Sequence, residues 1–220
     1  MVATLLVGLQ VNVTSQAQTL KQLREGPCTL DQPLSNDLYA QLSAPTAAKG
    51  LVSGIPQTDR LASKLERRYF IQVPQGEFLR VIVNQELLDV SVSAAPRGDR
   101  TAKAITVDRL NGSEGPESLS VLAPVSETYD IVVKAVSDFF EIGGFTIVAD
   151  GPRLPTESDL KRLRAERSEM EGIDLLESAS QQSSVDSTRL STITNKFKES
   201  EDLFHEVGDT YEEALAVYSR

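Results

Sequence analysis

The sequence contains no tryptophan, one cysteine and one histidine among its 220 residues. Because Cys28 has no second cysteine to pair with, an intrachain disulfide is excluded. The single histidine, His205, lies far along the chain from Cys28, and no nucleophile stands beside a base at a recognisable spacing. No catalytic residue is therefore predicted, and the chain is predicted not to be an enzyme.

Positive charge is also scarce, since 22 Lys and Arg stand against 32 Asp and Glu, which gives a net charge of −10. Proteins bind nucleic acid and anionic lipid surfaces mainly through Lys and Arg. Neither a nucleic acid nor an anionic membrane surface is expected as a partner. No apolar run is long enough to cross a membrane as a helix, so no membrane span is predicted.

The longest apolar run, residues 3–11, lies close to the N-terminus and is followed by the small residues Ser15 and Ala17. This order is typical of a secretory signal, although no Lys or Arg precedes the run. Residues 1–17 are interpreted as a candidate signal peptide, and export to the periplasm or the exterior is expected. A cytoplasmic protein with an ordinary apolar N-terminus is the alternative.

Residues 18–50 contain scattered Pro, Gly, Ser and Ala without a sustained period and are read as a linker. From residue 51 to residue 150 apolar residues alternate with polar ones in several short runs. These runs place on one face Tyr69, Ile71 and Val73; Leu79, Val81 and Val83; Leu88, Val90 and Val92; Leu119 and Val121; Tyr129, Ile131 and Val133; and Phe145 and Ile147. The pattern predicts an antiparallel β-sandwich or barrel over residues 51–150.

Glycine-containing stretches separate these runs and predict hairpins or sheet-crossing loops. They are centred on Gly76, on Gly98, on Gly112 with Gly115, and on Gly143 with Gly144. Asn111 followed by Gly112 is the strongest hairpin signal.

After Pro152 and Pro155 the apolar period becomes helical, and Thr156 or Ser158 is positioned to cap the first helix. Its apolar stripe is predicted to contain Leu160, Leu163, Met170, Ile173 and Leu176. A polar loop over residues 177–187, a second helix that ends at Gly208 and a third helix from residue 209 complete the range 156–220. The fold class is thus an antiparallel all-β sandwich followed by a helical hairpin.

The helical range 156–220 holds fifteen Asp and Glu against eight Lys and Arg. It is either a solvated polar face or an acidic groove for a basic partner segment. The final helix carries apolar residues with no polar cap after them, so we expect residues 209–220 to fray, to self-associate or to wait for a missing downstream repeat.

Four segments follow one another along the chain: RRYFIQVPQGEFLRVIVNQELLDVSVSA, NGSEGPESLSVLAPVSETYDIVV, RLRAERSEMEGIDLL and FKESEDLFHEVGDTYEEALAVY. Together they resemble the N-terminal half of bacterial tetratricopeptide repeat (TPR) proteins that end in a CHAT domain. The resemblance implies a sandwich similar to the prepeptidase C-terminal fold, followed by an incomplete array of TPR-like helices. The residues that match the passage from one repeat to the next are Leu203, Phe204, Gly208, Asp209, Tyr211 and Ala214, whereas Ser200 stands where the repeat usually has Ala.

A CHAT domain is similar to caspase-like proteases and carries a His and a Cys, but no position in this chain matches its motifs. The resemblance therefore implies no catalytic residue here. It indicates a non-enzymatic protein–protein interaction module, with a protein partner on the helices and no cofactor. The alternative is the regulatory half of a CHAT protease.

A third, weaker reading is a secreted sandwich that binds calcium or a sugar. Asn111, Glu114 and Glu117, with the nearby Asp108, could offer oxygen ligands to calcium, but their spacing is not that of an EF-hand loop. A solvated polar loop explains them more simply, so no metal site is predicted.

Overall fold

The computed structural model describes residues 42–43, 46–99, 101–109, 111–113, 115–136, 142–181 and 186–220. The candidate signal peptide at 1–17 and Cys28 lie outside these ranges, so the interpretations that rest on them stay predictions.

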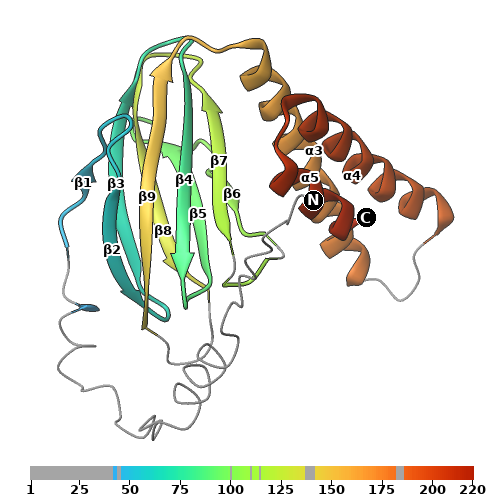
Figure 1. Ribbon diagram of the computed structural model, residues 1–220, viewed down its shortest axis with the longest axis horizontal. Helices are drawn as coiled ribbons and strands as arrows, with labels where there is room; N and C mark the ends of the chain where they lie inside the picture. Colours follow the sequence, from blue (N-terminus) through green and yellow to red (C-terminus); the bar gives the residue numbers. More distant parts are fainter. Residues whose placement is uncertain are drawn as a thin grey trace, which may run out of the picture. The chain divides into compact units, whose positions relative to one another are not determined.

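In the part of the chain that the structure describes, nine strands form two sheets, followed by three helices (Figure 1). The strands are β1 (Lys49–Gly50), β2 (Gln57–Ala62), β3 (Glu66–Val73), β4 (Phe78–Glu86), β5 (Val90–Pro96), β6 (Ile105–Val107), β7 (Pro116–Leu122), β8 (Glu127–Ala135) and β9 (Ile142–Arg153). The first sheet has the order β1-β3-β8-β5-β6 and the second β2-β9-β4-β7. Neighbouring strands in these sheets run antiparallel except β1 with β3. The predicted antiparallel sandwich followed by helices is confirmed.

The alternating runs identified in the sequence supply the interior of the sandwich. Every residue that the pattern placed on an inward face is buried, and together these residues form one cluster between the two sheets. Burial of this apolar area is the main stabilising contribution to the sandwich.

Two of the predicted turns are corrected by the structure. Gly143 and Gly144 lie inside β9, not in a turn. A Cβ at Gly143 would lie 2.4 Å from both the carbonyl oxygen of Glu86 and the Cβ of Leu88, so this glycine permits close approach of neighbouring backbone. Asn111 and Gly112 do not close a hairpin between paired strands, because β6 belongs to the first sheet and β7 to the second. They lie in a sheet-crossing loop, the other form that the sequence predicts.

Helix α3 (Glu157–Ser180) begins at the N-cap Thr156, as predicted, and Asp159 completes a capping box. It pairs with α4 (Ser187–Val207), which ends at Gly208 with φ 74°. Asp209 then caps α5 (Thr210–Ser219). The polar loop predicted over 177–187 starts later than expected, because α3 continues to Ser180.

The predicted apolar stripe of α3 is wrong at its two ends, since Leu160 is 43% and Leu176 39% exposed. The buried face of the helix contains small and charged residues instead: Asp159, Ala165, Glu166, Ser168, Glu169, Gly172 and Ala179. The reason is that α3 has two neighbours. Its small residues contact α4, where a Cβ at Gly172 would lie 3.0 Å from the Phe197 ring, and its glutamates face the sandwich.

Candidate functional site

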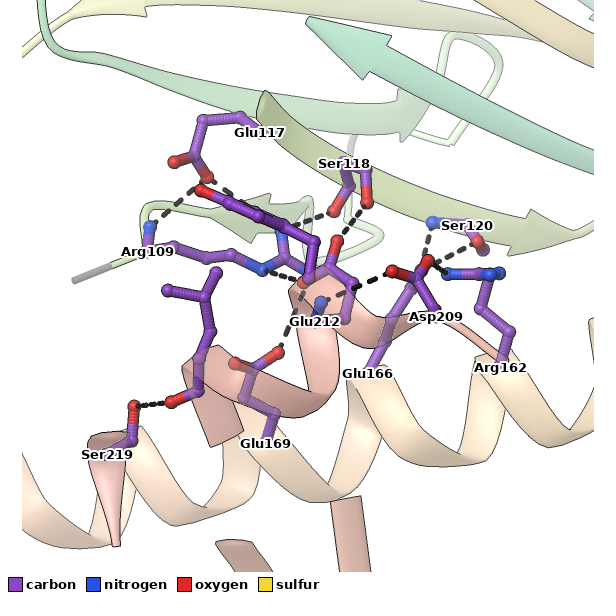
Figure 2. Close-up of polar contacts among 12 residues, drawn as sticks. Arg109, Glu117, Ser118, Ser120, Arg162, Glu166, Glu169, Asp209, Glu212 and Ser219 are labelled. Carbon is purple, nitrogen blue, oxygen red and sulfur yellow. Dashed lines mark hydrogen bonds and ion pairs between the residues drawn. The ribbon is translucent and has the colours of Figure 1, made fainter. Parts of the chain in front are cut away.

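The outer side of β7 is where the sandwich and the helices meet. Among the described strands β7 is the last of the second sheet, so its outward backbone groups face no neighbouring strand in that part of the chain. Side chains take that place (Figure 2). The Ser120 N–H donates to Glu166 Oε2 at 2.8 Å, and Arg109 Nη1 donates to the Ser118 carbonyl oxygen at 2.7 Å. The edge strand is therefore closed by one carboxylate and one guanidinium group.

Arg109 is the centre of this junction and is 4% exposed. Its Nε lies 2.8 Å from Glu212 Oε2 on α5, and its Nη2 lies 3.5 Å from Glu169 Oε2 on α3. Its Nη1 lies 3.8 Å from Glu117 Oε2 on β7, and its backbone N–H donates to the same oxygen. One buried cation thus binds carboxylates from three separate elements.

A second layer of charge surrounds Asp209, the N-cap of α5. Its Oδ2 lies 2.7 Å from Arg162 Nη1 on α3 and 3.4 Å from Arg80 Nη2 on β4. The same carboxylate accepts the Glu212 N–H, so one side chain both caps α5 and ties it to α3 and β4.

We define the ionic junction as the eight charged residues Arg80, Arg109, Glu117, Arg162, Glu166, Glu169, Asp209 and Glu212. With every group ionised it holds five carboxylates and three guanidinium groups, an excess of negative charge. Burial raises the pKa of Glu117 to about 7 and that of Glu169 to about 7, although Arg109 opposes both shifts. Burial likewise raises the pKa of Glu166. Protonation of Glu117 and Glu169 near neutral pH relieves part of the excess charge.

Helix α5 has a partner within the chain, which corrects the expectation drawn from its uncapped apolar end. Glu212 and Ala216 are buried, and Ser118 Oγ donates to Glu212 Oε1 at 2.8 Å. The Tyr211 hydroxyl lies against Gly115, where a Cβ would be 1.9 Å from the hydroxyl oxygen. Asn111 Nδ2 donates to the same hydroxyl at 3.1 Å. Gly115 has φ +81°, so both its conformation and its lack of a side chain are needed at this contact.

A groove runs beside the junction and consists of two hollows. The apolar hollow, with a volume of about 520 Å³, lies between the ends of β5, β6, β7 and β8 and one side of α3. Its apolar lining comes mainly from Ala94, Pro96, Ile105, Val121, Leu122, Pro124, Tyr129, Leu163 and Met170. The acidic hollow, of about 180 Å³, adjoins it and is lined by Asp108, Arg109, Glu166, Glu169, Asp174 and Glu177 among others. We call the two together the α3 groove.

The residues singled out in the sequence are not brought together. His205 is exposed on α4, where its Nδ1 lies 3.1 Å from Glu213 Oε1. Glu117 points into the ionic junction, Asn111 contacts α5, and Asp108 lines the acidic hollow. Glu114 lies outside the described residues. Within the described ranges no three His, Cys, Asp or Glu side chains are grouped as a metal site.

The sequence analysis missed the ionic junction. A usable signal was present in α3, where Glu166 and Glu169 lie three residues apart next to the small residue Ala165. Residues at this spacing share one helix face, which also carries Met170 and Ile173, and two glutamates on an otherwise apolar face are unusual for a helix that packs on a sandwich. The pairing with Arg109 could not be seen from the sequence.

No family model and no curated protein matches the chain. Several solved structures are similar to the sandwich, including the following three. The pre-peptidase C-terminal domain of a collagenase from Bacillus anthracis is 11% identical, with 48% of this chain and 99% of that chain covered and a TM-score of 0.34. PliG from Aeromonas hydrophila, a periplasmic inhibitor of g-type lysozyme, is 15% identical over 47% of this chain and 98% of its own, with a TM-score of 0.34.

The third is CorA, a surface-associated copper-binding protein of Methylomicrobium album BG8. It is 7% identical, with 48% of this chain and 98% of that chain covered and a TM-score of 0.36. At these identities and TM-scores the likeness carries no argument about function. Among the helices that the structure describes, none is both long and apolar enough to cross a bilayer.

Proposed function

We propose that the chain is a non-enzymatic protein-interaction module that binds a segment of a partner protein in the α3 groove. The observation that carries this proposal is the apolar hollow of about 520 Å³, which is built jointly by the sandwich and α3. Hollows of several hundred Å³ with a predominantly apolar lining and a few polar groups are the usual form of binding sites. The ionic junction supports this role because it fixes α3 beside the sandwich and so fixes the width of the groove.

A binding role is supported further by the chemistry of the lining. The hydroxyl of Ser120 donates to Glu166 Oε1 at 2.9 Å, a contact that could suggest a nucleophile and its base. Glu166 also accepts the backbone N–H of the same residue, so the carboxylate holds the strand edge through both groups. We infer that this pair is structural, and we expect no turnover when the purified protein is incubated with a peptide library. Turnover that Cys28→Ala, His205→Ala or Ser120→Ala abolishes would contradict this inference.

The finer parts of the sequence interpretation remain proposals. We propose that α3, α4 and α5 are TPR-like helices, which is supported by the resemblance and by the break at Gly208 and Asp209 between α4 and α5. The regulatory half of a CHAT protease remains the alternative, supported by the same resemblance. Export is proposed from residues 1–17, and N-terminal sequencing of protein made in a bacterial host tests it: an intact Met1 on cytoplasmic protein would contradict export.

The groove can be tested with two matched substitutions. Leu122 lines the apolar hollow and is 40% exposed, whereas Val125, three residues later, is 54% exposed and lines neither hollow. Peptides selected from a displayed random library on the wild-type protein should bind Val125→Glu unchanged. They should bind Leu122→Glu at least about tenfold more weakly, because a charge in the hollow loses a central apolar contact. Equal binding to wild type and Leu122→Glu would overturn the proposal.

A further inference from the structure

The two hollows of the α3 groove form a continuous surface with different chemistry at its two ends. Glu166, Met170 and Asp174 line both, so a ligand that fills the apolar hollow reaches the acidic one along α3. A ligand that fills the whole groove therefore needs two chemically different parts, one for each hollow.

Three carboxylates at the acidic end are exposed, and no cation in the described part of the chain forms an ion pair with them. Among the described residues, Asp108, Asp174 and Glu177 have no salt bridge, in contrast to Glu169, which lies 3.5 Å from Arg109. Partial burial raises the pKa of Asp108, and the nearby carboxylates of Asp89 and Glu177 raise it further. A cation placed there would be attracted by several negative groups at once.

Apart from Arg109, whose charge is already met by three buried glutamates, positive side chains line only the apolar end. Lys103 and Arg167 line the apolar hollow, and neither lines the acidic hollow. Glu171, also on the apolar side, is already bound by Lys196 at 2.6 Å. The charges of the groove are thus polarised, which would orient a ligand with its cation at the Asp108 end.

We propose that the ligand of the α3 groove is a protein segment with apolar side chains adjacent to lysine or arginine. Its apolar side chains fill the hollow between Tyr129 and Met170, and its cation lies against Asp108, Asp174 and Glu177. This rests on the proposed function and adds the chemistry of the partner. The net charge of −10 favours association with such a segment over an acidic one.

Fluorescently labelled synthetic peptides test the charge of the partner. The probe is a short peptide with two leucines and a phenylalanine followed by two lysines, and the comparison peptides have both lysines replaced by glutamine or by glutamate. In anisotropy titrations at low salt the lysine peptide should bind about five- to tenfold more tightly than the glutamine peptide, and the glutamate peptide most weakly. Asp174→Asn combined with Glu177→Gln should remove the preference for lysine.

The matched control is Asp202→Asn combined with Glu206→Gln, which removes the same charge from α4 but lines neither hollow. It should keep the preference. If lysine and glutamine peptides bind equally and Leu122→Glu weakens both, the proposed function stands and the basic partner is overturned. If lysine peptides bind but Leu122→Glu does not weaken them, binding is outside the groove and both proposals fail. If no peptide binds, the apolar-basic partner is overturned, while the display selection still tests the groove.

Discussion

The interior of the sandwich and the centre of the ionic junction, around Arg109, are equally buried but chemically opposite. Val81 and Ile131 in the interior are 0% exposed, and so is Glu117 in the junction, while Glu212 is 1% exposed. Apolar residues gain free energy by leaving water and do so in almost any close arrangement. Buried charges lose hydration and are tolerated only when opposite charges and donors meet them in the right geometry. The interior therefore supplies stability, whereas the junction sets how α3 and α5 sit on the sandwich.

The largest effect that separates the two regions is expected from Arg109→Met, which keeps most of the side-chain length but removes the charge. It leaves the carboxylates of Glu117, Glu169 and Glu212 without their shared cation. We expect a loss of about 3–5 kcal/mol in the free energy of unfolding. Hydrogen exchange should show that the substitution speeds amide exchange, relative to the wild type, more in α3 and α5 than in β3 and β8.

Phe145→Ala serves as the comparison from the sandwich interior, with a similar expected loss of about 3–5 kcal/mol. The two losses should differ in pH dependence. The loss for Arg109→Met should shrink at about pH 5, where unpaired glutamates are protonated, whereas the loss for Phe145→Ala should not. A junction variant with no pH dependence would show that charge pairing is not what holds the helices.

Next in size is the pH dependence of the wild-type protein. The pKa values of Glu117 and Glu169 are about 7 in the folded protein, above the ordinary value of 4.5. Between pH 4.5 and pH 7 the folded state therefore binds more protons than the unfolded state. Stability must then fall as pH rises from about 4.5 to about 7, by about 2–3 kcal/mol for each group taken alone. Urea unfolding across this range measures it.

Glu117→Gln combined with Glu169→Gln should flatten this dependence, because neither amide titrates. Below the range the trend should reverse, since hydrogen bonds from Arg153 hold the pKa of Asp159 below its ordinary value. Stability that rises between pH 4.5 and 7 would contradict the assignment of the raised pKa values to these glutamates.

A smaller effect is expected from Gly115→Ala at the contact with α5. The new Cβ meets the Tyr211 hydroxyl and also occupies a backbone conformation with φ +81°. Gly76→Ala is the control, because Gly76 has φ +76° and no atom within 4 Å of an added Cβ. We expect a cost of about 1 kcal/mol for the control and about 2 kcal/mol for Gly115→Ala. Equal costs would mean that Tyr211 adapts without loss.

The smallest effect concerns Leu87, which follows β4 with φ 63° and is 82% exposed. Asparagine tolerates this left-handed conformation better than leucine does, so Leu87→Asn should raise the free energy of unfolding by about 0.5 kcal/mol. Leu154→Asn is the control, since Leu154 is 76% exposed and is not among the described residues with positive φ. Denaturant midpoints would show whether the gain is specific to Leu87.

The sandwich could be predicted because its signal is local. Alternation along a strand fixes which residues face inward, and each run, such as Tyr69, Ile71 and Val73, carries this signal by itself. Gly143 shows the limit of such reasoning. Glycine fits both a turn and a strand that another backbone approaches closely, and only the neighbouring Glu86 and Leu88 decide between them.

The junction could not be predicted because its pairs are distant in sequence. Arg109 and Glu212 are about a hundred residues apart, and each resembles the many solvated charges of an acidic chain. The same ambiguity affects α5, whose apolar end suggests a missing neighbour. Its docking depends on Asp209, Tyr211 and Glu212, polar or amphipathic residues whose partners appear only when the chain is folded.

The closure of β7 by Glu166 and Arg109 also limits how two copies of the sandwich can associate. A side chain that occupies the outward N–H of Ser120 denies that position to a strand from another molecule. Release of α3 would expose the backbone of β7 and allow strand-to-strand polymerisation. The helices thus protect the sheet edge, and we expect loss of the junction to leave an unpaired strand edge that favours aggregation.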